Sequence, residues 1–384
     1  MSWVPGLPAD LVPRAVRQRH SGPYRAAVVS PVASSTPRID GRTAALADEA
    51  SREIARFDAQ VGSEIAPFAT VLLRSESASS SQIEKLTAGA KAVAVAELGE
   101  GTSRNAISVL GNVRAMRAAL ALAGDLSTSS ILSMHAALLE EVDPDIAGRW
   151  RTEQVWIGGD SYGPHGAAFT PPIADDVPDL IEDLMSFARR DDVPVLVLAA
   201  VSHAQFETIH PFPDGNGRTG RALIHTLLRR YELTRAVTVP VSAGLLTDVG
   251  SYFAALTAYR DGDPAPIVSS LATGTLEAVV NARRLVDDLH AVRARWDDAV
   301  TARRDAAAWR VADLLLRQPV LDAATIAREI GVAPGNALRA LEPLAAAGVV
   351  TEFSGRARNR LWQAREVLDA VDAFAARAGR RHPG

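Results

Sequence analysis

Residues 194–209 place the strongest constraint on what this chain can fold into. Val, Leu, Ala, Phe and Ile occupy most positions of this segment, so a helix built from it is apolar around nearly its whole circumference. Such a helix has to be surrounded by protein. With 384 residues and 47% hydrophobic content, the chain is long enough for two or three domains of ~150 residues each. We therefore predict a mainly α fold with this helix at its centre.

Helical periodicity and end signals locate the other helices of the predicted core. Ser127, Thr128 and Ser129 are candidate caps for one of them. Pro, Gly and Ser break the periodicity up to about residue 45, which predicts an extended arm. The Ser-rich stretch at 75–81 predicts a break between two helices. The helices expected around the central one span about 43–73, 82–98, 105–123, 127–141, 175–190 and 218–231.

One short segment has a residue composition that differs from that of the surrounding helices. Residues 151–157 are rich in β-branched and aromatic side chains and end at Gly158-Gly159, and Ala167–Thr170 follow before Pro171-Pro172. Two such runs joined by a glycine turn are typical of a β-hairpin. We predict a small hairpin inserted in the helical domain.

The polar residues of greatest interest directly follow the central helix. Residues 210–221 read His-Pro-Phe-Pro-Asp-Gly-Asn-Gly-Arg-Thr-Gly-Arg. A Gly-Asn-Gly turn that leads into a helix directs backbone N–H groups and the positive end of the helix dipole at an anion. Arg218 and Arg221 lie three residues apart on the first helical turn, where both can hold phosphate oxygens. The run therefore predicts a phosphate-binding site for a nucleotide.

Two further side chains of this run can act on a bound nucleotide. Asp214 supplies a carboxylate beside the phosphates, and Mg²⁺ prefers one or two protein oxygens together with phosphate and water. His210 has a pKa range that allows it to accept a proton from an attacking hydroxyl at neutral pH. A lone histidine or a glycine-rich turn is a weak signal, whereas an acid, an amide and two arginines in one run make the combination specific.

Other candidate residues are better explained by packing. His203 and His225 lie on the helices that flank the motif, and histidines in such positions are more often packed than catalytic. Tyr252 and Tyr259, seven residues apart on a later helix, could frame an adenine ring, but this spacing is more typical of core packing.

At residues 210–221 the sequence resembles the Fic family, whose signature is His-Pro-Phe-x-Asp/Glu-Gly-Asn-Gly-Arg-x-x-Arg, and it matches every fixed position. The resemblance implies a helical core with a hairpin, and transfer of AMP from Mg-ATP to a Ser, Thr or Tyr hydroxyl of a protein target or of the enzyme itself. The Doc branch, which transfers phosphate, has alanine in place of the first glycine of the turn and lysine in place of the second. This sequence has Gly215 and Gly217 at those positions.

The resemblance also implies a role for each residue of the motif. His210 is the base, Asp214 the metal ligand and Phe212 the buried anchor of the loop. Arg218 holds the inner phosphates and Arg221 the γ-phosphate, which turns the α-phosphorus toward His210. The residues implied to bind the nucleotide are Asp214, Gly215, Asn216, Gly217, Arg218 and Arg221.

Two outlying segments resemble the family as well. Residues 149–172 resemble the flap that holds a target segment as an added strand, although by themselves they are only a surface hairpin. Ser80 and Glu84 match the inhibitory motif Ser/Thr-x-x-x-Glu-Gly/Asn, which implies that Glu84 pairs with Arg221 and keeps the resting enzyme slow. Lys85 replaces the final Gly/Asn, which predicts a less close approach of this helix. From the residues alone, Ser80 and Glu84 are a helix cap and a first-turn acid.

The C-terminal part is predicted to be a separate winged helix. Helices at 308–317, 323–330 and 335–347, followed by two extended runs up to Trp362, give a helix-turn-helix with a wing. Residues 321–384 contain nine Arg against seven acidic residues, three of the Arg at the wing (Arg356, Arg358 and Arg360). Only Asn336 and Arg339 could read bases, so DNA binding and protein docking both stay open.

The expected organisation is an N-terminal helical arm with the inhibitory helix (1–124), a Fic core (125–275), a helical linker (276–305) and the winged helix (306–384). A formal charge of −4 and zero Cys fit a cytoplasmic protein that does not coat nucleic acid or membrane. The main interpretation is a protein adenylyltransferase that uses ATP and Mg²⁺. The alternative is a winged-helix DNA-binding regulator with a vestigial nucleotide site, and an oligomeric assembly stays open in both cases.

Overall fold

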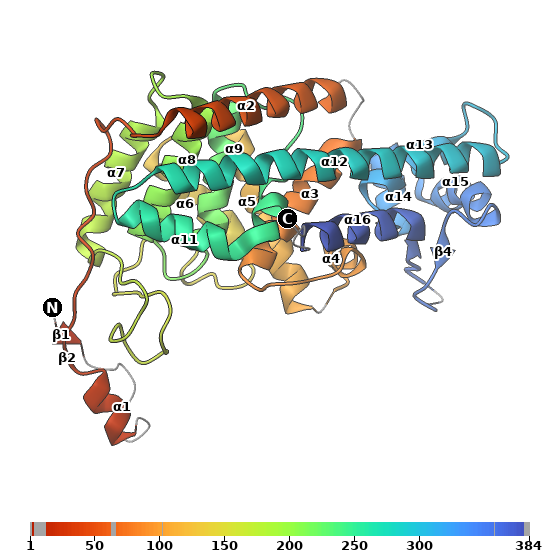
Figure 1. Cartoon of the computed structure of the whole chain (residues 1–384). Coiled ribbons are helices and arrows are strands. Elements are labelled where there is room, and N and C mark those ends of the chain that lie inside the picture. The colour runs from red at the N-terminus through yellow and green to blue at the C-terminus, as the bar shows by residue number, and fades with distance from the viewer. Residues whose placement is uncertain (1, 4–12, 63–66, 102, 357, 380–384) are drawn as a thin grey trace.

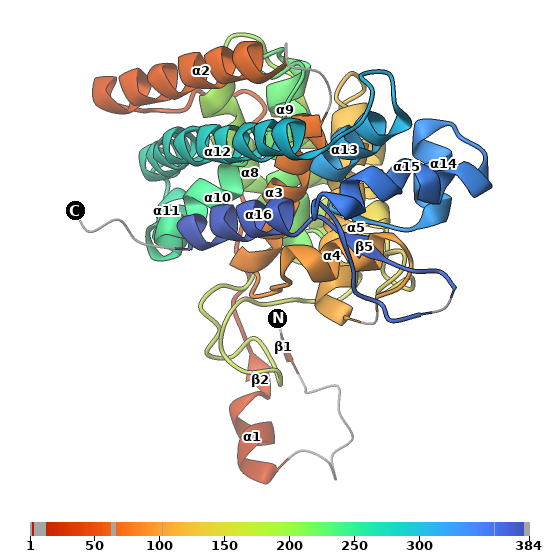
Figure 2. The same ribbon diagram turned by 90° about the vertical axis from the view of Figure 1, so that its right-hand side faces the viewer.

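The computed structural model describes residues 2–3, 13–62, 67–101, 103–356 and 358–379. It is mainly helical, with long helices stacked side by side and a smaller C-terminal group at one end (Figures 1 and 2). The predicted fold class, a mainly α protein with a helical core, is confirmed. Within the described ranges, no helix is long and apolar enough to cross a membrane.

The central helix is α8 (Val195–Ile209), and every residue from Leu196 to Ile209 is buried. It packs against α9 (Asn216–Arg230), α7 (Val177–Ala188), α12 (Ala265–Ala299), α2 (Gly41–Gly62) and α11 (Val249–Arg260). Helices on several sides satisfy its uniformly apolar surface. The position of its C-terminal end, where the motif begins, is therefore fixed by the whole core.

Helices α5 (Arg104–Ala121) and α6 (Thr128–Leu139) form a pair beside this core. Ser127 caps α6 as predicted: its backbone N–H donates to Ser130 Oγ at 3.1 Å, and its own hydroxyl accepts from Ser130 N at 3.4 Å. This reciprocal arrangement is a capping box in which serine replaces the usual Glu or Gln. Three shorter helices precede the C-terminal group: α1 (Arg14–Arg19), α4 (Ala90–Glu97) and α10 (Val241–Leu245). Short 3₁₀ turns lie at Ala174–Asp176 and Leu246–Asp248.

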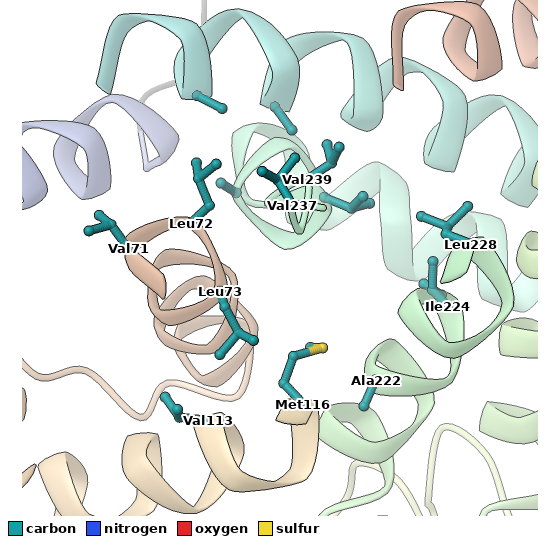
Figure 3. Close-up of a cluster of buried hydrophobic side chains, with 14 of the residues drawn as sticks. Val71, Leu72, Leu73, Val113, Met116, Ala222, Ile224, Leu228, Val237 and Val239 are labelled. Carbon is teal, nitrogen blue, oxygen red and sulfur yellow. The ribbon is translucent and has the colours of Figure 1, made fainter. Parts of the chain in front are cut away.

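Helix α3 (Pro67–Ile83) runs without interruption through the Ser-rich stretch. The predicted break at 75–81 and the predicted helix start near Gln82 are therefore wrong. Ser77 Oγ donates to Leu73 O and Ser81 Oγ to Ser77 O, both at 2.9 Å. Hydroxyls that bond to the preceding turn are compatible with a helix, and because these serines are small they allow close packing. The apolar residues of α3 meet α5 and α9 in one buried cluster (Figure 3).

The predicted helix at 43–73 is divided between α2, which ends at Gly62, and α3, which begins at Pro67. Residues 63–66 of that prediction lie outside the described residues. Proline is well suited to the first turn of a helix, because its missing N–H would have no intrahelical partner there.

A left-handed residue ends α3. Lys85 has φ +63°, Lys85 N donates to Gln82 O at 2.8 Å, and Leu86 N donates to Ser81 O at 3.0 Å. These two bonds and the positive φ define a Schellman motif, whose left-handed position favours Gly or Asn. The Gly/Asn preference at this position of the inhibitory motif is thus explained by backbone conformation, which lysine adopts here with some strain.

The C-terminal group contains α13 (Ala307–Arg317), α14 (Ala323–Ile330) and α15 (Pro334–Ala346). Strands β3 (Val320–Leu321), β4 (Thr351–Glu352) and β5 (Trp362–Gln363) form an antiparallel sheet in the order β3-β5-β4. Helices and strands follow one another in the predicted order, with β3 as an addition. The winged-helix class and any DNA contact stay predictions, and Arg356 at the wing is engaged with Glu100 at 2.8 Å.

A further helix that the sequence analysis did not identify, α16 (Arg365–Ala378), joins this group to the core. Glu366 accepts from Trp296 Nε1 on α12 at 2.7 Å, and Asn281 Nδ2 on α12 donates to Phe374 O at 3.2 Å. The predicted boundary between residues 275 and 276 falls inside the continuous helix α12. The three boundaries between the four predicted domains stay predictions.

The predicted hairpin is reduced to one antiparallel bridge between Ile157 and Phe169. Pro171 and Pro172 have no N–H, so the strand pairing cannot continue beyond Thr170. Side-chain donors replace it: Gln154 Nε2 bonds to Pro171 O at 2.9 Å, and Arg151 Nη2 bonds to Pro172 O at 2.5 Å. The segment is a loop with one bridge rather than a two-stranded hairpin.

The extended arm lies against this loop and α7 (Figure 1). Ala27 N donates to Thr170 O at 2.9 Å, and Val32 N donates to Asp183 Oδ2 on α7 at 2.6 Å. The arm also carries α1 and a short antiparallel pair, β1 (Ser2–Trp3) with β2 (Gly22–Pro23). Residues 1 and 4–12 of the predicted arm lie outside the described residues.

We expect Lys85→Gly to raise the free energy of unfolding by about 1 kcal/mol, because glycine adopts the left-handed conformation without the Cβ clash. Lys85→Ala keeps the Cβ and serves as the matched control, with no gain expected. Chemical denaturation of the three proteins measures the difference. Equal stabilisation by both substitutions would mean that the lysine side chain, and not the backbone, is the source of the strain.

Candidate active site

The motif begins where α8 ends. His210 is the C-terminal cap of α8 and has a left-handed backbone, with φ 50° and its N–H bonded to Phe206 O at 2.9 Å. The chain then turns through Pro211–Asp214 and enters α9 at Asn216, after Gly215 with φ 76°. Histidine at a positive φ is uncommon. This backbone directs residue 210 out of the helix and into the loop that the motif forms.

Asn216 closes the loop with two hydrogen bonds. Its Oδ1 accepts from Phe212 N at 2.9 Å, and its Nδ2 donates to Phe212 O at 2.8 Å. The side chain therefore fixes the loop, and the backbone N–H of Asn216 is left for the predicted contact with phosphate. This division of roles is a refinement of the sequence-based assignment, in which Asn216 was only part of the phosphate cradle.

Phe212 anchors the loop in the core, as the family resemblance implied. It is fully buried and stacks on His135, with ring centroids 3.6 Å apart, and on Trp150 at 4.8 Å. His135 Nδ1 accepts from Gly148 N at 3.0 Å, so its Nε2 carries the proton that bonds to Asp214 O at 3.0 Å. Burial lowers the pKa of His135 to about 4, which keeps this neutral tautomer in place. Sequence reasoning missed His135, since it lies 79 residues from Asp214.

Arg151 links the loop at 149–172 to the motif. Its Nε donates to His210 O at 2.9 Å, and its backbone N–H donates to Pro211 O at 3.0 Å. Arg151 is only 3% exposed, and burial lowers the pKa of its guanidinium to about 10. The guanidinium remains charged at neutral pH and holds the flap segment to the backbone of His210.

His210 is neutral at physiological pH. Burial, together with the charges of Arg260 and Arg151, lowers the pKa of His210 to about 4, although Glu207 and Glu84 oppose this shift. A neutral imidazole can accept a proton, which is the state a general base requires.

Glu207 is a second titratable group beside this imidazole. Its Oε2 lies 3.9 Å from His210 Nδ1. Burial raises the pKa of Glu207 to about 7, although Arg221 lowers it. The carboxyl therefore changes charge near neutral pH next to the candidate base. Sequence reasoning missed Glu207, and the available signal was an acidic residue on an apolar helix one turn before the motif histidine.

The predicted phosphate cradle lies at the start of α9. The first backbone N–H groups of a helix have no intrahelical partner, and Gly215 has no side chain with which to cap them. Arg218 is 3% exposed, and its Nη2 lies 3.3 Å from Asp214 Oδ2. The Asp214 side chain is 69% exposed, so its carboxylate faces solvent beside the cradle and is accessible to a cation.

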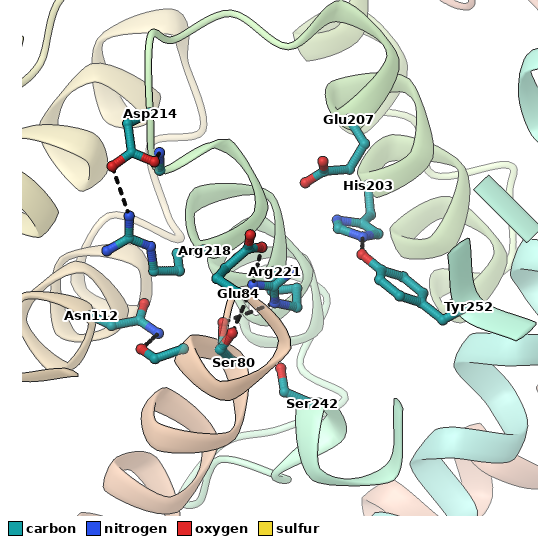
Figure 4. Close-up of polar contacts among 12 residues, drawn as sticks. Ser80, Glu84, Asn112, His203, Glu207, Asp214, Arg218, Arg221, Ser242 and Tyr252 are labelled. Carbon is teal, nitrogen blue, oxygen red and sulfur yellow. Dashed lines mark hydrogen bonds and ion pairs between the residues drawn. The ribbon is translucent and has the colours of Figure 1, made fainter. Parts of the chain in front are cut away.

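Arg221 is held by α3 and not by its own helix (Figure 4). Its Nε donates to Ser80 Oγ at 2.9 Å, and its Nη2 donates to Ser80 O at 2.8 Å and to Glu84 Oε1 at 2.9 Å. Burial lowers the pKa of Arg221, but the facing Glu84 carboxylate raises it, and the net shift is upward. Ser80 and Glu84 are therefore neither a cap nor a first-turn acid, because both lie at the C-terminal end of α3.

Gly217 allows this contact. A Cβ at residue 217 would lie 2.0 Å from Glu84 Oε1 and 2.9 Å from Arg221 Nη1. Any other residue there would displace Glu84. The expectation that Lys85 keeps the helix at a distance is wrong, because residue 85 affects the backbone at the end of α3 and its side chain is exposed.

Buried polar contacts fix α3 in this position. Glu76 on α3 accepts from Ser242 N at 2.8 Å and from Ser242 Oγ at 2.5 Å, and His225 Nε2 on α9 lies 3.0 Å from Glu76 Oε1. Asn112 Nδ2 on α5 donates to Ser77 O at 2.8 Å. The helix that carries Glu84 is thus attached to three neighbouring elements.

The other histidine and the tyrosines make packing contacts. His203 Nε2 is 2.7 Å from the Tyr252 hydroxyl, and burial lowers the pKa of His203 to about 3. Tyr252 is 1% exposed, and the Tyr259 hydroxyl donates to Gln205 Oε1 at 2.7 Å. Hydrogen bonds within the core therefore explain the positions of His203, Tyr252 and Tyr259.

Known proteins share the motif region and the fold. Residues 125–228 match the model of the Fic/DOC family. "Protein adenylyltransferase fic-1" of Caenorhabditis elegans is 31% identical over 151 residues, which cover 38% of this chain and 27% of that protein. "Protein adenylyltransferase Fic" of Drosophila willistoni is 35% identical over 109 residues, which cover 28% of this chain and 20% of that protein. The chain thus spans only about a quarter of the length of these curated relatives.

A crystal structure of a Fic family protein from Desulfovibrio desulfuricans G20 has a similar fold, with a TM-score of 0.55 and 22% sequence identity. The similarity covers 86% of this chain and 98% of that chain. The family match begins just before α6 and ends within α9, so it contains the loop, the cradle and His210. This chain therefore carries a domain of the Fic/DOC family at residues 125–228.

Proposed function

We propose that the protein is an adenylyltransferase that moves AMP from Mg-ATP to a Ser, Thr or Tyr hydroxyl of a protein target and of itself. The observation that carries the proposal is the junction of α8 and α9, where a neutral histidine, free helix-start N–H groups and two buried arginines meet at one loop. The names of the relatives from C. elegans and D. willistoni support it.

The reaction needs one proton acceptor and a strong anion site. The hydroxyl oxygen attacks the α-phosphorus, the bond from this phosphorus to the oxygen it shares with the β-phosphate breaks, and pyrophosphate leaves. His210 accepts the hydroxyl proton. The start of α9 and Arg218 hold the inner phosphates, and Arg221 holds the γ-phosphate, so that catalysis consists mainly of positioning and charge stabilisation.

Asp214 would hold Mg²⁺. Its exposed carboxylate lies beside the cradle, and Mg²⁺ in such sites takes one or two carboxylates together with phosphate oxygens. Bound there, the ion would neutralise phosphate charge during transfer. The chain's own contribution is the orientation of this carboxylate, because Asp214 Oδ1 accepts from Gly215 N at 2.6 Å.

The protein target would be held along residues 149–172. Arg151 connects this loop to the backbone of His210, so a segment held there is near the base. Ile157 makes the one antiparallel bridge of the loop, and an extended peptide could add to such backbone. Because Ala27 N donates to Thr170 O, the chain's own N-terminal arm already occupies part of this loop's backbone.

The resting enzyme would be slow because Glu84 occupies Arg221. While the Glu84 contact of 2.9 Å is present, Arg221 is unavailable to the γ-phosphate. ATP can still bind through the helix start and Arg218, but its α-phosphorus is not held for in-line attack. The Glu84 side chain is 39% exposed, so the restraint is weaker than a fully buried ion pair would give.

We expect His210→Ala to abolish AMP incorporation while ATP binding survives, because the imidazole accepts the proton and does not hold phosphate. Intact-protein mass spectrometry measures the adduct, and equilibrium dialysis measures ATP binding. Asp214→Ala should lose activity together with its Mg²⁺ dependence. An undiminished rate in His210→Ala would contradict its assignment as the base.

The rate should depend on pH in two steps. Deprotonation of His210 gives an acid limb of kcat/KM near its pKa of about 4. As Glu207 loses its proton near pH 7, its negative charge stabilises the imidazolium formed in the transition state, so the rate rises again. Glu207→Gln should keep the acid limb and lose the step near pH 7. A Glu207→Gln profile that matches wild type would remove Glu207 from the mechanism.

We expect Glu84→Gly to raise the initial rate of self-modification by about tenfold or more, which corresponds to ~1.4 kcal/mol or more of released restraint. Glu84→Gln keeps the size of the side chain and separates the effect of charge. Arg221→Ala and the double variant should both be slow, because no guanidinium remains to hold the γ-phosphate. If Glu84→Gly is no faster than a slow wild type, the inhibitory role of Ser80 and Glu84 is wrong.

A further inference from the structure

The N-terminal arm lies along the loop at residues 149–172 (Figure 1). Three contacts join the two segments, in the same order along both: His20 Nε2 with Asp160 Oδ2 at 2.9 Å, His165 Nε2 with Pro23 O at 3.1 Å, and Ala27 N with Thr170 O at 2.9 Å. From residue 24 to residue 32 the arm contains no helix, and the last of these contacts joins backbone to backbone. Extended peptides are held in this way by strand addition. The arm therefore lies where the proposed function places a target segment.

Tyr24 lies in the middle of this arm segment, and its side chain is directed at the loop. The phenol hydroxyl donates to Gln154 Oε1 at 3.2 Å. The ring meets the His165 ring edge-on, with centroids 6.3 Å apart and an angle of 70° between the two planes. Loop residues thus position both the hydroxyl and the ring of Tyr24, and the side chain is half-buried.

Gln154 belongs to the part of the loop that leads to His210. It lies three residues after Arg151, and three residues of extended chain span at most about 10 Å. Arg151 Nε in turn donates to His210 O at 2.9 Å. Burial raises the pKa of Tyr24 although the Arg151 charge lowers it, and the same charge adds to the burial that lowers the pKa of His210. The phenol and the imidazole therefore both lie close to one guanidinium.

Two serines of the arm are directed to other parts of the chain. Ser21 Oγ donates to Arg17 O within the arm itself. Ser30 is exposed, and its carbonyl accepts from Gln205 Nε2 on α8 at 3.0 Å. Neither of these contacts directs the serine hydroxyl at the loop.

The hydroxyls further along the arm lie at the opposite end of α8 from the motif. Ser35 O accepts from Arg190 Nη1, and Arg190 precedes the start of α8. Because α8 has 15 residues, its two ends are about 22 Å apart, and His210 is at the far end. Ser34 and Thr36 adjoin Ser35. Tyr24 is thus the best-placed acceptor among the hydroxyls of the described arm.

We propose that Tyr24 is the residue on which the enzyme modifies itself, by transfer of AMP from ATP bound in the same molecule. This step rests on the proposed function. Tyr24 Oη attacks the α-phosphorus, the bond from this phosphorus to the oxygen it shares with the β-phosphate breaks, and pyrophosphate leaves. His210 accepts the phenol proton, and the product is a tyrosine–AMP phosphodiester. The phenol gives up its hydrogen bond to Gln154 before attack, and a neutral bond of this kind contributes little net free energy.

The test uses Mg-ATP and the full chain with Glu84→Gly, which the proposed function expects to be the faster form. Trypsin cleaves after Arg19 and Arg25, so Ser21 and Tyr24 lie on one peptide, and fragment-ion mass spectrometry separates them. We expect AMP on Tyr24 at the earliest time points. AMP on any other residue of the chain, with Tyr24 unmodified, would overturn the proposal.

Three variants that each delete one hydroxyl of the arm give the matched comparison. Tyr24→Phe keeps the ring and should lose self-modification, whereas Ser21→Ala and Ser30→Ala should keep it. ATP binding verifies that each variant is folded. Tyr24→Phe should still transfer AMP to proteins of a cell lysate, because an acceptor on the arm is not needed for transfer to another molecule. Loss of that transfer in a folded Tyr24→Phe variant contradicts a role as acceptor alone.

Mixing two variants separates transfer within one molecule from transfer between molecules. Tyr24→Phe supplies an active site without its acceptor, and His210→Ala supplies the acceptor without its base. We expect AMP on neither chain of the mixture. The fraction of unmixed chains modified per unit time should also be unchanged on about tenfold dilution, because an intramolecular step has a fixed effective concentration. AMP on Tyr24 of the His210→Ala chain, or a rate that falls with dilution, contradicts transfer within one molecule.

The same measurements separate this proposal from the proposed function. AMP on lysate proteins or on another residue of the chain, with Tyr24 unmodified, rejects Tyr24 as the acceptor and keeps the adenylyltransferase activity. Absence of AMP from both the chain and the lysate proteins contradicts the proposed function, and self-modification of Tyr24 with it.

Discussion

The fold depends on giving one buried guanidinium its hydrogen-bond partners. Arg221 is 1% exposed, and a charge that water cannot reach is very unfavourable unless its donors are used. In the described structure its partners are Ser80 and Glu84. Because Ser80 lies on α3 and Glu84 directly follows its last turn, this helix has to lie against the start of α9. The absence of a side chain at Gly217 follows from the same contact, since a Cβ would occupy the place of the Glu84 carboxylate.

The way α3 is attached decides how Arg221 can exchange partners. Glu76 fixes the middle of α3 through Ser242 and His225, whereas Glu84 lies just beyond the last helical residue and is partly exposed. Rotation of the Glu84 side chain therefore removes the carboxylate from Arg221 without moving the helix, and the two hydrogen bonds to Ser80 remain. The Glu84 carboxylate also keeps the guanidinium oriented.

Much of this arrangement was predictable from short-range patterns, and the errors have definite physical causes. The central helix, the cap at Ser127 and the composition of the 210–221 loop depend on residues close together in the sequence. The Ser-rich stretch was misread because serine is a poor helix former when exposed, whereas buried serines such as Ser77 and Ser81 bond to their own helix. Arg151 and His135 were missed because their contacts to the motif bring together residues 59 and 79 positions apart. The predicted hairpin does not extend beyond Thr170, because Pro171 has no N–H to continue the strand pairing. The two prolines were visible in the sequence.

The two hydrogen bonds between Asn216 and Phe212 have a consequence for the energetics of the proposed nucleotide binding. They join residues four positions apart, and Phe212 is already stacked on His135 in the core. The shape of the loop is thus settled during folding, with no contribution from a ligand. Loops that become ordered only on association lose conformational entropy at that moment, which weakens binding. This loop avoids that loss, so the proposed binding of a polyphosphate would not include the cost of ordering the loop.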